Sequence, residues 1–358
     1  MNILENIKKQ IKKNYKLYIF LRNLHGLKKG MSGLITGKRG SWDHVKSTLS
    51  LMKRSSHVSG FPMNIAIEPT NACNLKCPVC ETGVGDLNRK TKYIKFDDFK
   101  IIIDKVYKHT NVLMYYFMGE PFLNKDWVKE VRYAKEKGIP FITTCTNGDL
   151  ANAEDIIESK IDFVSFQLGG MSDETHKIYR VGSNFEKVIQ NLEELLLLRK
   201  QRNASWLEIE AGFILMKHNE HEVEKFKNFC REKGVDHCNV IDPCVRTVEQ
   251  GHEMLPSDKN HWYYDPKSFF KGQLRPKIIP KNDCSWIYYS MVVTAEGDIV
   301  PCCRDPKATL KMGNLITDEL GDIWNNKKYQ KFRKGISNNQ KDIDICRLCS
   351  GYGISDIA

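Results

Sequence analysis

The chain has 358 residues, of which 41% are hydrophobic, enough for one large domain with a buried core and a smaller second domain. Its first residues lack the apolar segment and cleavage site of an export signal, and no stretch reaches the roughly 20 apolar residues of a membrane span. We therefore expect a cytoplasmic protein whose 12 cysteines more often bind metal than form disulfides. A formal net charge of +11 fits either an anionic partner or a solvated lysine-rich surface.

The first segment, residues 1–62, is strongly basic and contains no cysteine. Apolar and aromatic residues recur there at helical spacing, at Ile3, Ile7, Ile11, Tyr15 and Tyr18. This pattern predicts a helical extension that either packs against the main domain or lies on an anionic membrane as a basic amphipathic helix. Residues 26–40 are rich in glycine and lysine and predict a loop, without the Gly-Lys-Ser/Thr ending of a phosphate-binding loop.

Residues 63–244 alternate between short apolar runs and amphipathic segments. The predicted strands are Asn64–Glu68, Leu113–Met118, Phe141–Thr146, Phe163–Gln167, Glu208–Met216 and Cys238–Asp242. The predicted helices are Phe96–Lys108, Trp127–Lys137, Ala153–Lys160, Phe185–Lys200 and Glu220–Lys233. Such alternation predicts an α/β fold with a parallel sheet, helices outside it, and functional loops at the C-terminal ends of the strands.

A cysteine cluster follows the first predicted strand, in the stretch Ile65–Glu81. Cys73, Cys77 and Cys80 are separated by three and by two residues, within the sequence C-N-L-K-C-P-V-C. Three thiolates this close on one loop can hold three irons of a cubic 4Fe–4S cluster and leave the fourth iron open for a small molecule. A zinc site that lacks one ligand, or three reduced thiols without a metal, are the alternatives.

The C-N-L-K-C-P-V-C stretch resembles the CxxxCxxC signature of the radical S-adenosylmethionine (radical SAM) enzymes. The resemblance implies a partial (β/α)6 barrel of the TIM type. It also implies that the open iron binds SAM and that an external donor, such as flavodoxin or ferredoxin, supplies an electron. Cleavage of SAM then gives a 5′-deoxyadenosyl radical, which takes a hydrogen atom from the substrate.

The same resemblance points to residues at the ends of the second and third strands. Gly119, Glu120 and Pro121 are similar to the family's Gly-Gly-Glu-Pro segment, which binds the amino group of SAM, although Met118 replaces the first glycine. A carboxylate is the natural complement of an ammonium group. Asn147, in Thr-Asn-Gly, is similar to a third-strand ending that lies near SAM. An ordinary Gly-Glu-Pro turn is the alternative interpretation.

Four further residues complete the expected SAM site. Ser165 and Gln167 share one face of the fourth strand, because side chains alternate along a strand. Relatives commonly carry a serine and an acid there, so Gln167 departs from the pattern and keeps only hydrogen bonding. Arg180 matches an arginine that can pair with the SAM carboxylate, and a surface ion pair is its alternative role. Met216, at the end of the fifth strand, is expected near the adenine.

The last part of the chain contains a linker and a second cysteine-bearing module. Residues 245–283 hold four prolines and predict a linker that crosses the barrel mouth, and residues 284–358 hold the module. Its cysteines are Cys284, Cys302, Cys303, Cys346 and Cys349. Their spacing alone fits zinc or an iron–sulfur cluster. Beside a radical SAM barrel, it resembles the auxiliary-cluster domains called SPASM and Twitch.

This second resemblance implies one auxiliary 4Fe–4S cluster, held by Cys284, Cys302, Cys346 and Cys349. The adjacent Cys303 either replaces Cys302 or packs beside the cluster. A fully ligated cluster would accept an electron from the substrate radical.

The sequence leaves the substrate open. We expect an oxidoreductase that acts on a polyol, sugar or lipid-linked substrate, with peripheral contact at the inner membrane face through the basic N-terminus and with no nucleic acid partner. One alternative is a peptide maturase that forms a crosslink, thioether or epimer, and another is a non-catalytic iron–sulfur or zinc protein. Positional candidates for an acid or base at the barrel mouth are Glu210, Asp242, Arg246 and His252.

Overall fold

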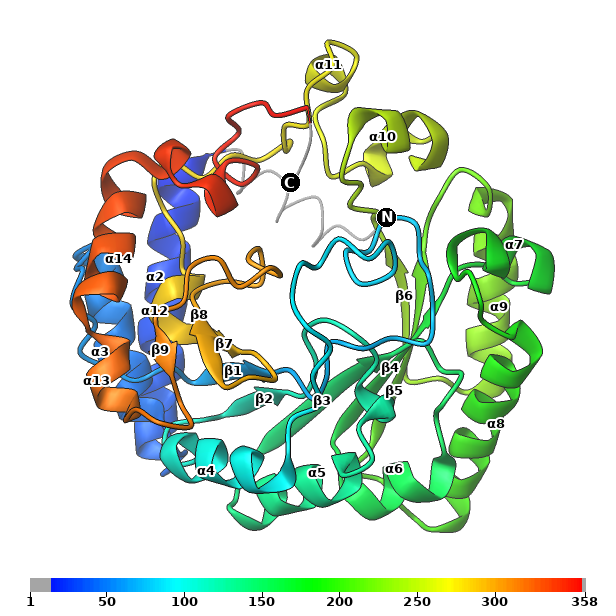
Figure 1. Cartoon of the computed structure of the whole chain (residues 1–358), viewed down its shortest axis with the longest axis horizontal. Coiled ribbons are helices and arrows are strands. Elements are labelled where there is room, and N and C mark those ends of the chain that lie inside the picture. The colour runs from blue at the N-terminus through cyan, green and yellow to red at the C-terminus, as the bar shows by residue number, and fades with distance from the viewer. Residues whose placement is uncertain (1–13, 356–358) are drawn as a thin grey trace.

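The computed structural model describes residues 14–355 and contains one curved sheet of nine strands (Figure 1). The strands of the barrel are β1 (Asn64–Ile67), β2 (Val112–Met114), β3 (Phe141–Thr146), β4 (Phe163–Leu168), β5 (Glu208–Ile214) and β6 (His237–Ile241). Neighbours in this series all pair in parallel, in the order of the sequence. The predicted partial barrel of six parallel strands is therefore confirmed, and the barrel is open rather than closed.

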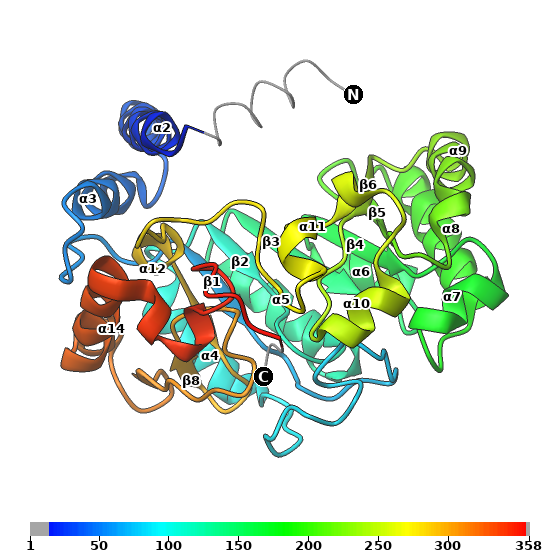
Figure 2. The same cartoon turned by 90° about the horizontal axis from the view of Figure 1, so that it is seen from above.

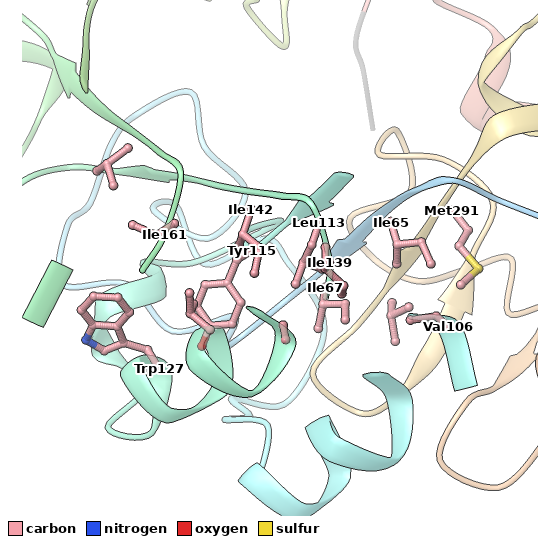
Figure 3. Close-up of a cluster of buried hydrophobic side chains, with 14 of the residues drawn as sticks. Ile65, Ile67, Val106, Leu113, Tyr115, Trp127, Ile139, Ile142, Ile161 and Met291 are labelled. Carbon is pink, nitrogen blue, oxygen red and sulfur yellow. The ribbon is translucent and has the colours of Figure 1, made fainter. Parts of the chain in front are cut away.

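Helices cover the outer side of this sheet in Figure 1. They are α4 (Phe96–Val106), α5 (Trp127–Glu136), α6 (Ala153–Ser159), α7 (Asp173–Tyr179), α8 (Phe185–Gln201) and α9 (Val223–Lys233). Alternation along the strands separates the two faces, since Val164 and Phe166 of β4 join the buried core beneath the helices. Figure 3 shows that core, with Ile65 and Ile67 of β1 beside Leu113 of β2 and Tyr115, which follows that strand. The intervening side chains of each strand face the barrel interior.

The C-terminal module extends the same sheet. Its strands are β7 (Ser290–Val293), β8 (Asp298–Val300) and β9 (Gly313–Asn314), and its helices are α12 (Trp286–Tyr289), α13 (Leu320–Trp324) and α14 (Lys327–Asn339). β7 pairs in parallel with β1, so that Asn64 lies opposite Ser290, while β8 and β9 continue in antiparallel fashion. The module is thus joined to the first barrel strand by backbone hydrogen bonds. The segment boundaries at residues 62, 244 and 283 stay predictions.

The N-terminal segment forms two helices, α2 (Tyr15–Ile35) and α3 (Ser41–Met52). The prediction of a loop over residues 26–40 is wrong for residues 26–35, because α2 continues to Ile35. Gly30 and Gly33 lie on the face of α2 that meets α3, where an added Cβ would come within 2.7 Å of Val45 and collide with Ser41. Close helix packing therefore offsets the roughly 1 kcal/mol that each glycine costs a helix.

The predicted helix residues Ile3, Ile7 and Ile11 lie outside the described residues. Among residues 14–355, no helix is long and apolar enough to cross a membrane.

The segment after the barrel forms a small unit of its own rather than an extended chain. It contains α10 (Val248–Met254), a 3-10 turn at Lys259–His261 and α11 (Pro266–Phe269). Trp262, Tyr264 and Phe269 are buried in a second apolar cluster that also includes Val79, from the cysteine loop. Figure 2 shows α10 and α11 on the side of the molecule away from α2 and α3. This unit therefore packs onto the loop that holds the first three cysteines.

Candidate active site

A cavity of about 160 Å³ lies at the C-terminal ends of the barrel strands. It brings together eight of the residues predicted from the sequence, namely Cys73, Cys77, Cys80, Gly119, Glu120, Asn147, Gln167 and Arg180. They come from the loops after β1, β2, β3 and α7 and from β4 itself. The structure thus places the three thiols and the expected SAM-binding residues around one space.

The long loop that carries the cysteines is tied down at its base. The buried carboxylate of Glu68 accepts two hydrogen bonds from Arg89, at 2.6 and 2.8 Å, and another from the backbone amide of Ala295. Asn71 donates to the carbonyl of Lys90 and accepts from the amide of Lys92, which closes the loop on itself. A loop fixed in this way holds its thiols in position before any cluster is bound.

The unit that follows the barrel holds the same loop from the other side. Arg246 donates to Glu81 at 2.8 Å and to the carbonyl of Val79, and Gln250 donates to the carbonyl of Pro78. Arg246, one of the positional candidates for an acid or base, is therefore engaged in holding the cysteine loop.

Gly119 and Glu120 connect the second strand to this loop. Gly119 has φ of +75°, and a Cβ there would lie 2.5 Å from the carbonyl oxygens of both Thr70 and Ala72. Only glycine fits this close approach. The backbone amide of the next residue, Glu120, donates to the carbonyl of Ala72 at 2.7 Å. The cysteine loop and the Gly-Glu-Pro segment are thus in direct backbone contact.

The Glu120 carboxylate is buried and accepts hydrogen bonds from the hydroxyl of Thr146, at 2.8 Å, and the amide of Asn147, at 2.9 Å. Burial raises the pKa of Glu120 to about 7, and these donors partly oppose the rise. A cation that enters the cavity would favour the ionised carboxylate, because opposite charges stabilise each other most where water is excluded. The site therefore suits an ammonium group.

Arg180 supplies a positive charge to the same cavity. Its guanidinium lies 3.7 Å from the sulfur of Cys77, and its Nε is buried without a partner among the described residues. The hydroxyl oxygen of Thr82, which also lines the cavity, is likewise unpartnered within residues 14–355. Three thiols, a buried carboxylate and a guanidinium with unused donors fit a 4Fe–4S cluster and the amino acid part of SAM.

Ser165 and Gln167 lie on the inner face of β4, next to the cavity. Gln167 donates to the hydroxyl of Ser165, which in turn donates to Glu210 of β5, both at 2.6 Å. Asn239 of β6 donates to the second oxygen of Glu210 at 3.3 Å. A hydrogen-bonded row therefore runs across three strands inside the barrel and includes the positional candidate Glu210.

The other predicted positions lie outside this row and outside the cavity lining. Pro121 begins a short 3-10 turn behind Glu120, and Met216 is buried with its amide bonded to Asn219. Asp242 pairs with His261, and the ring of His252 packs against that of Phe269.

A second cavity, of about 420 Å³, lies in the C-terminal module. Four thiols line it, those of Cys284, Cys302, Cys346 and Cys349, whereas Cys303 does not. Burial raises the pKa of Cys284 to about 11, against the influence of the backbone amides of Trp286 and Ile287, which favour the thiolate. Four thiols around one largely apolar space fit a fully ligated 4Fe–4S cluster, as predicted for an auxiliary centre.

The adjacent thiol of Cys303 is close to a different part of the molecule. Tyr116, which follows β2, is electrostatically coupled to Cys303, to Cys145 of the first cavity and to Glu210 of the barrel interior. Burial raises the pKa of Tyr116 to about 12. Tyr116 is not among the residues predicted from the sequence, although the alternation from Val112 through Met114 places it on the inner face.

The two adjacent cysteines give a direct test of this arrangement. Cys302→Ala is expected to lower the iron content of the reconstituted protein from about eight to about four atoms per chain, because one auxiliary ligand is lost. Cys303→Ala, the matched control, is expected to keep about eight. Iron and sulfide analysis with Mössbauer spectroscopy measures both. Loss of iron in the Cys303 variant alone would assign the ligand to Cys303 instead.

Comparison with known proteins agrees with the assignment of an iron–sulfur cluster to each of the two cavities. The family model for the radical SAM superfamily matches residues 67–230, and that for the SPASM iron–sulfur cluster-binding domain matches residues 284–350. The cofactor-modifying protein for the tungsten-containing aldehyde ferredoxin oxidoreductase of Pyrococcus furiosus is 23% identical over 305 residues, which cover 75% of this chain and 82% of that protein. The PqqA peptide cyclase of Bradyrhizobium diazoefficiens is 21% identical over 287 residues, covering 71% and 70%.

Solved structures share the fold at low sequence identity. Streptococcus suis SuiB, bound to its precursor peptide SuiA, has a TM-score of 0.59 and 16% identity, with 87% of this chain and 75% of that chain covered. The structure of anSMEcpe with bound AdoMet and a peptide has a TM-score of 0.54 and 19% identity, with 82% and 89% covered. Because both family models match, the chain belongs to the radical SAM superfamily and is a radical SAM enzyme with a C-terminal SPASM domain, whose cofactors are 4Fe–4S clusters and SAM.

Proposed function

We propose that this enzyme modifies a peptide. The observation that carries the proposal is the match to a peptide cyclase along 71% of the chain. The shared fold of SuiB, which was solved with a precursor peptide, agrees with it. The relative that covers 75% of the chain is named for cofactor modification, and neither of these two proteins acts by name on a polyol. These relatives favour peptide modification over the polyol, sugar or lipid-linked substrate expected from the sequence.

The residues inside the barrel suit a peptide. Glu210 and Gln167, joined through Ser165, present a carboxylate and an amide beside the SAM cavity, and both groups pair readily with backbone amides and carbonyls. The phenol of Tyr116, whose pKa is raised by burial and by the charges of Cys303 and Glu210 among others, adds an aromatic surface. We assign these side chains to substrate contact. When bound, the cluster and SAM supply the radical that takes a hydrogen atom.

The experiment uses the full chain, reconstituted anaerobically with iron and sulfide and reduced by flavodoxin or ferredoxin, the donors we propose. Synthetic peptides from short reading frames beside the gene are prepared with deuterated residues, and deuterated sugars and polyols form a second set. Mass spectrometry then measures deuterium in the released 5′-deoxyadenosine and the mass of each peptide.

Transfer of deuterium from a peptide, with a permanent mass change in that peptide, supports the proposal. Glu210→Gln should then slow peptide turnover by about tenfold or more while SAM cleavage without substrate continues, because the variant keeps the shape but loses the charge. Transfer from sugars or polyols only, with every peptide unchanged, would overturn the assignment and restore the earlier expectation.

A further inference from the structure

The outer face of helix α2 is apolar. Its exposed side chains recur at spacings of three, four and seven residues, which places them on one side of the helix. They are Leu17, Phe20, Leu21, Leu24, Met31, Leu34 and Ile35. We call this set the α2 stripe. Phe20 is 63% exposed, Leu24 53% and Ile35 87%.

The opposite face of the same helix is the one that packs against the protein. Gly26, Gly30 and Gly33 lie there, with Thr48, Val45 and Ser41 of α3 directly opposite. A surface helix normally buries its apolar side chains and exposes its polar ones. α2 does the reverse, since Gly30 and Gly33 are its buried residues while most of its large apolar side chains are exposed. Figure 2 shows α2 at the outer edge of the molecule.

The charge of the chain is concentrated in the same segment. Residues 1–62 hold 13 of the 55 lysines and arginines but only two of the 44 acidic residues, Glu5 and Asp43. They therefore account for the whole net charge of +11, and the remaining 296 residues are neutral overall. Among the described residues of α2, Lys16, Lys28 and Lys29 form no ion pair with a carboxylate, while Arg22 pairs with Asp283.

We propose that α2 binds an anionic phospholipid bilayer. The α2 stripe would enter the boundary between headgroups and acyl chains, and the long side chains of Lys16, Lys28 and Lys29 would extend to the phosphates. A second copy of this chain carries the same positive charge on the same face, so charge complementarity favours lipid over self-association. Trp42, exposed after the turn that follows α2, is of the residue type enriched at membrane interfaces.

Binding at this site would also bring the auxiliary module close to the membrane. Tyr15, Tyr18 and Arg22 of α2 line the cavity that contains the four C-terminal cysteines. The proposal does not depend on which substrate the enzyme modifies.

The test measures sedimentation of the full-length holoenzyme with vesicles under anaerobic conditions. Vesicles of phosphatidylcholine with about 30% phosphatidylglycerol are compared with pure phosphatidylcholine, at low and high salt. We expect partition into the anionic vesicles to be at least about tenfold stronger and to weaken with salt. The double variant Phe20→Glu/Leu24→Glu should lose this binding by about tenfold or more, because two apolar anchors become acidic.

Leu197→Glu is the matched control, because Leu197 is a similarly exposed apolar residue on α8, at 58%. It should bind as the wild type does, and iron content and circular dichroism verify that every variant is folded. Unchanged binding by the double variant would overturn the proposal. So would the absence of vesicle binding together with a dimer in analytical ultracentrifugation that the double variant abolishes, since the occupant would then be a second copy.

Discussion

Replacing Cys77 by alanine is expected to abolish release of 5′-deoxyadenosine. Cys77 is buried beside Arg180 and is one of three thiols around the SAM cavity, so its loss leaves two ligands for a cluster that needs three. Iron should fall from about eight to about four atoms per chain, because the auxiliary thiols lie in a separate cavity. Chromatography of the reaction products and iron analysis of the same sample measure both quantities.

Cys230→Ala provides the control for this result. Cys230 is a buried thiol on α9 that lines neither cavity. Its replacement by alanine is the same chemical change as in the Cys77 variant. That variant should retain all of its iron and its SAM cleavage. Full cleavage activity in the Cys77 variant would contradict the assignment of the first cavity.

Gly119→Ala is expected to lower the rate of SAM cleavage by about a hundredfold or more. The positive φ of Gly119 costs an alanine about 1 kcal/mol, and its Cβ would also meet two backbone oxygens at 2.5 Å. Backbone oxygens cannot rotate away as a flexible side chain could. The Gly-Glu-Pro segment must therefore move relative to the cysteine loop, and a shift near 1 Å at a reacting site is enough for such a loss.

Gly234→Ala separates the effect of backbone strain at a positive φ from the effect of the contact with the two carbonyl oxygens. Gly234 has φ of +70° at the end of α9, and within residues 14–355 no atom beyond the two adjoining residues lies within 4 Å of the position its Cβ would take. It should lose about 1 kcal/mol of stability in denaturant titration and retain the wild-type rate of SAM cleavage. Equal rates for the two variants would show that the contact between the loops is not needed for catalysis.

The parts of this enzyme that could be predicted from the sequence depend on residues that lie close together in the chain. The spacing of Cys73, Cys77 and Cys80 and the turn at Gly119 are local, and the alternation of strands and helices revealed the barrel. The role of Arg246 was not predictable, because its partner Glu81 lies 165 residues away. The helical state of residues 26–35 depends on α3, since glycines favour a helix only where another backbone comes close.

The pairing of β7 with β1 has a consequence for how the chain folds. The two strands lie 226 residues apart, from Asn64 to Ser290, so that this edge of β1 stays unpaired until β7 has been synthesised. Contacts of such long range form late, because a long loop must close before they are gained. The amide of Ala295, which donates to Glu68 at the base of the cysteine loop, follows β7 in the sequence and arrives with it. Synthesis of the C-terminal module thus completes the hydrogen bonds at the base of the loop for the first cluster. It also supplies the cysteines of the auxiliary site.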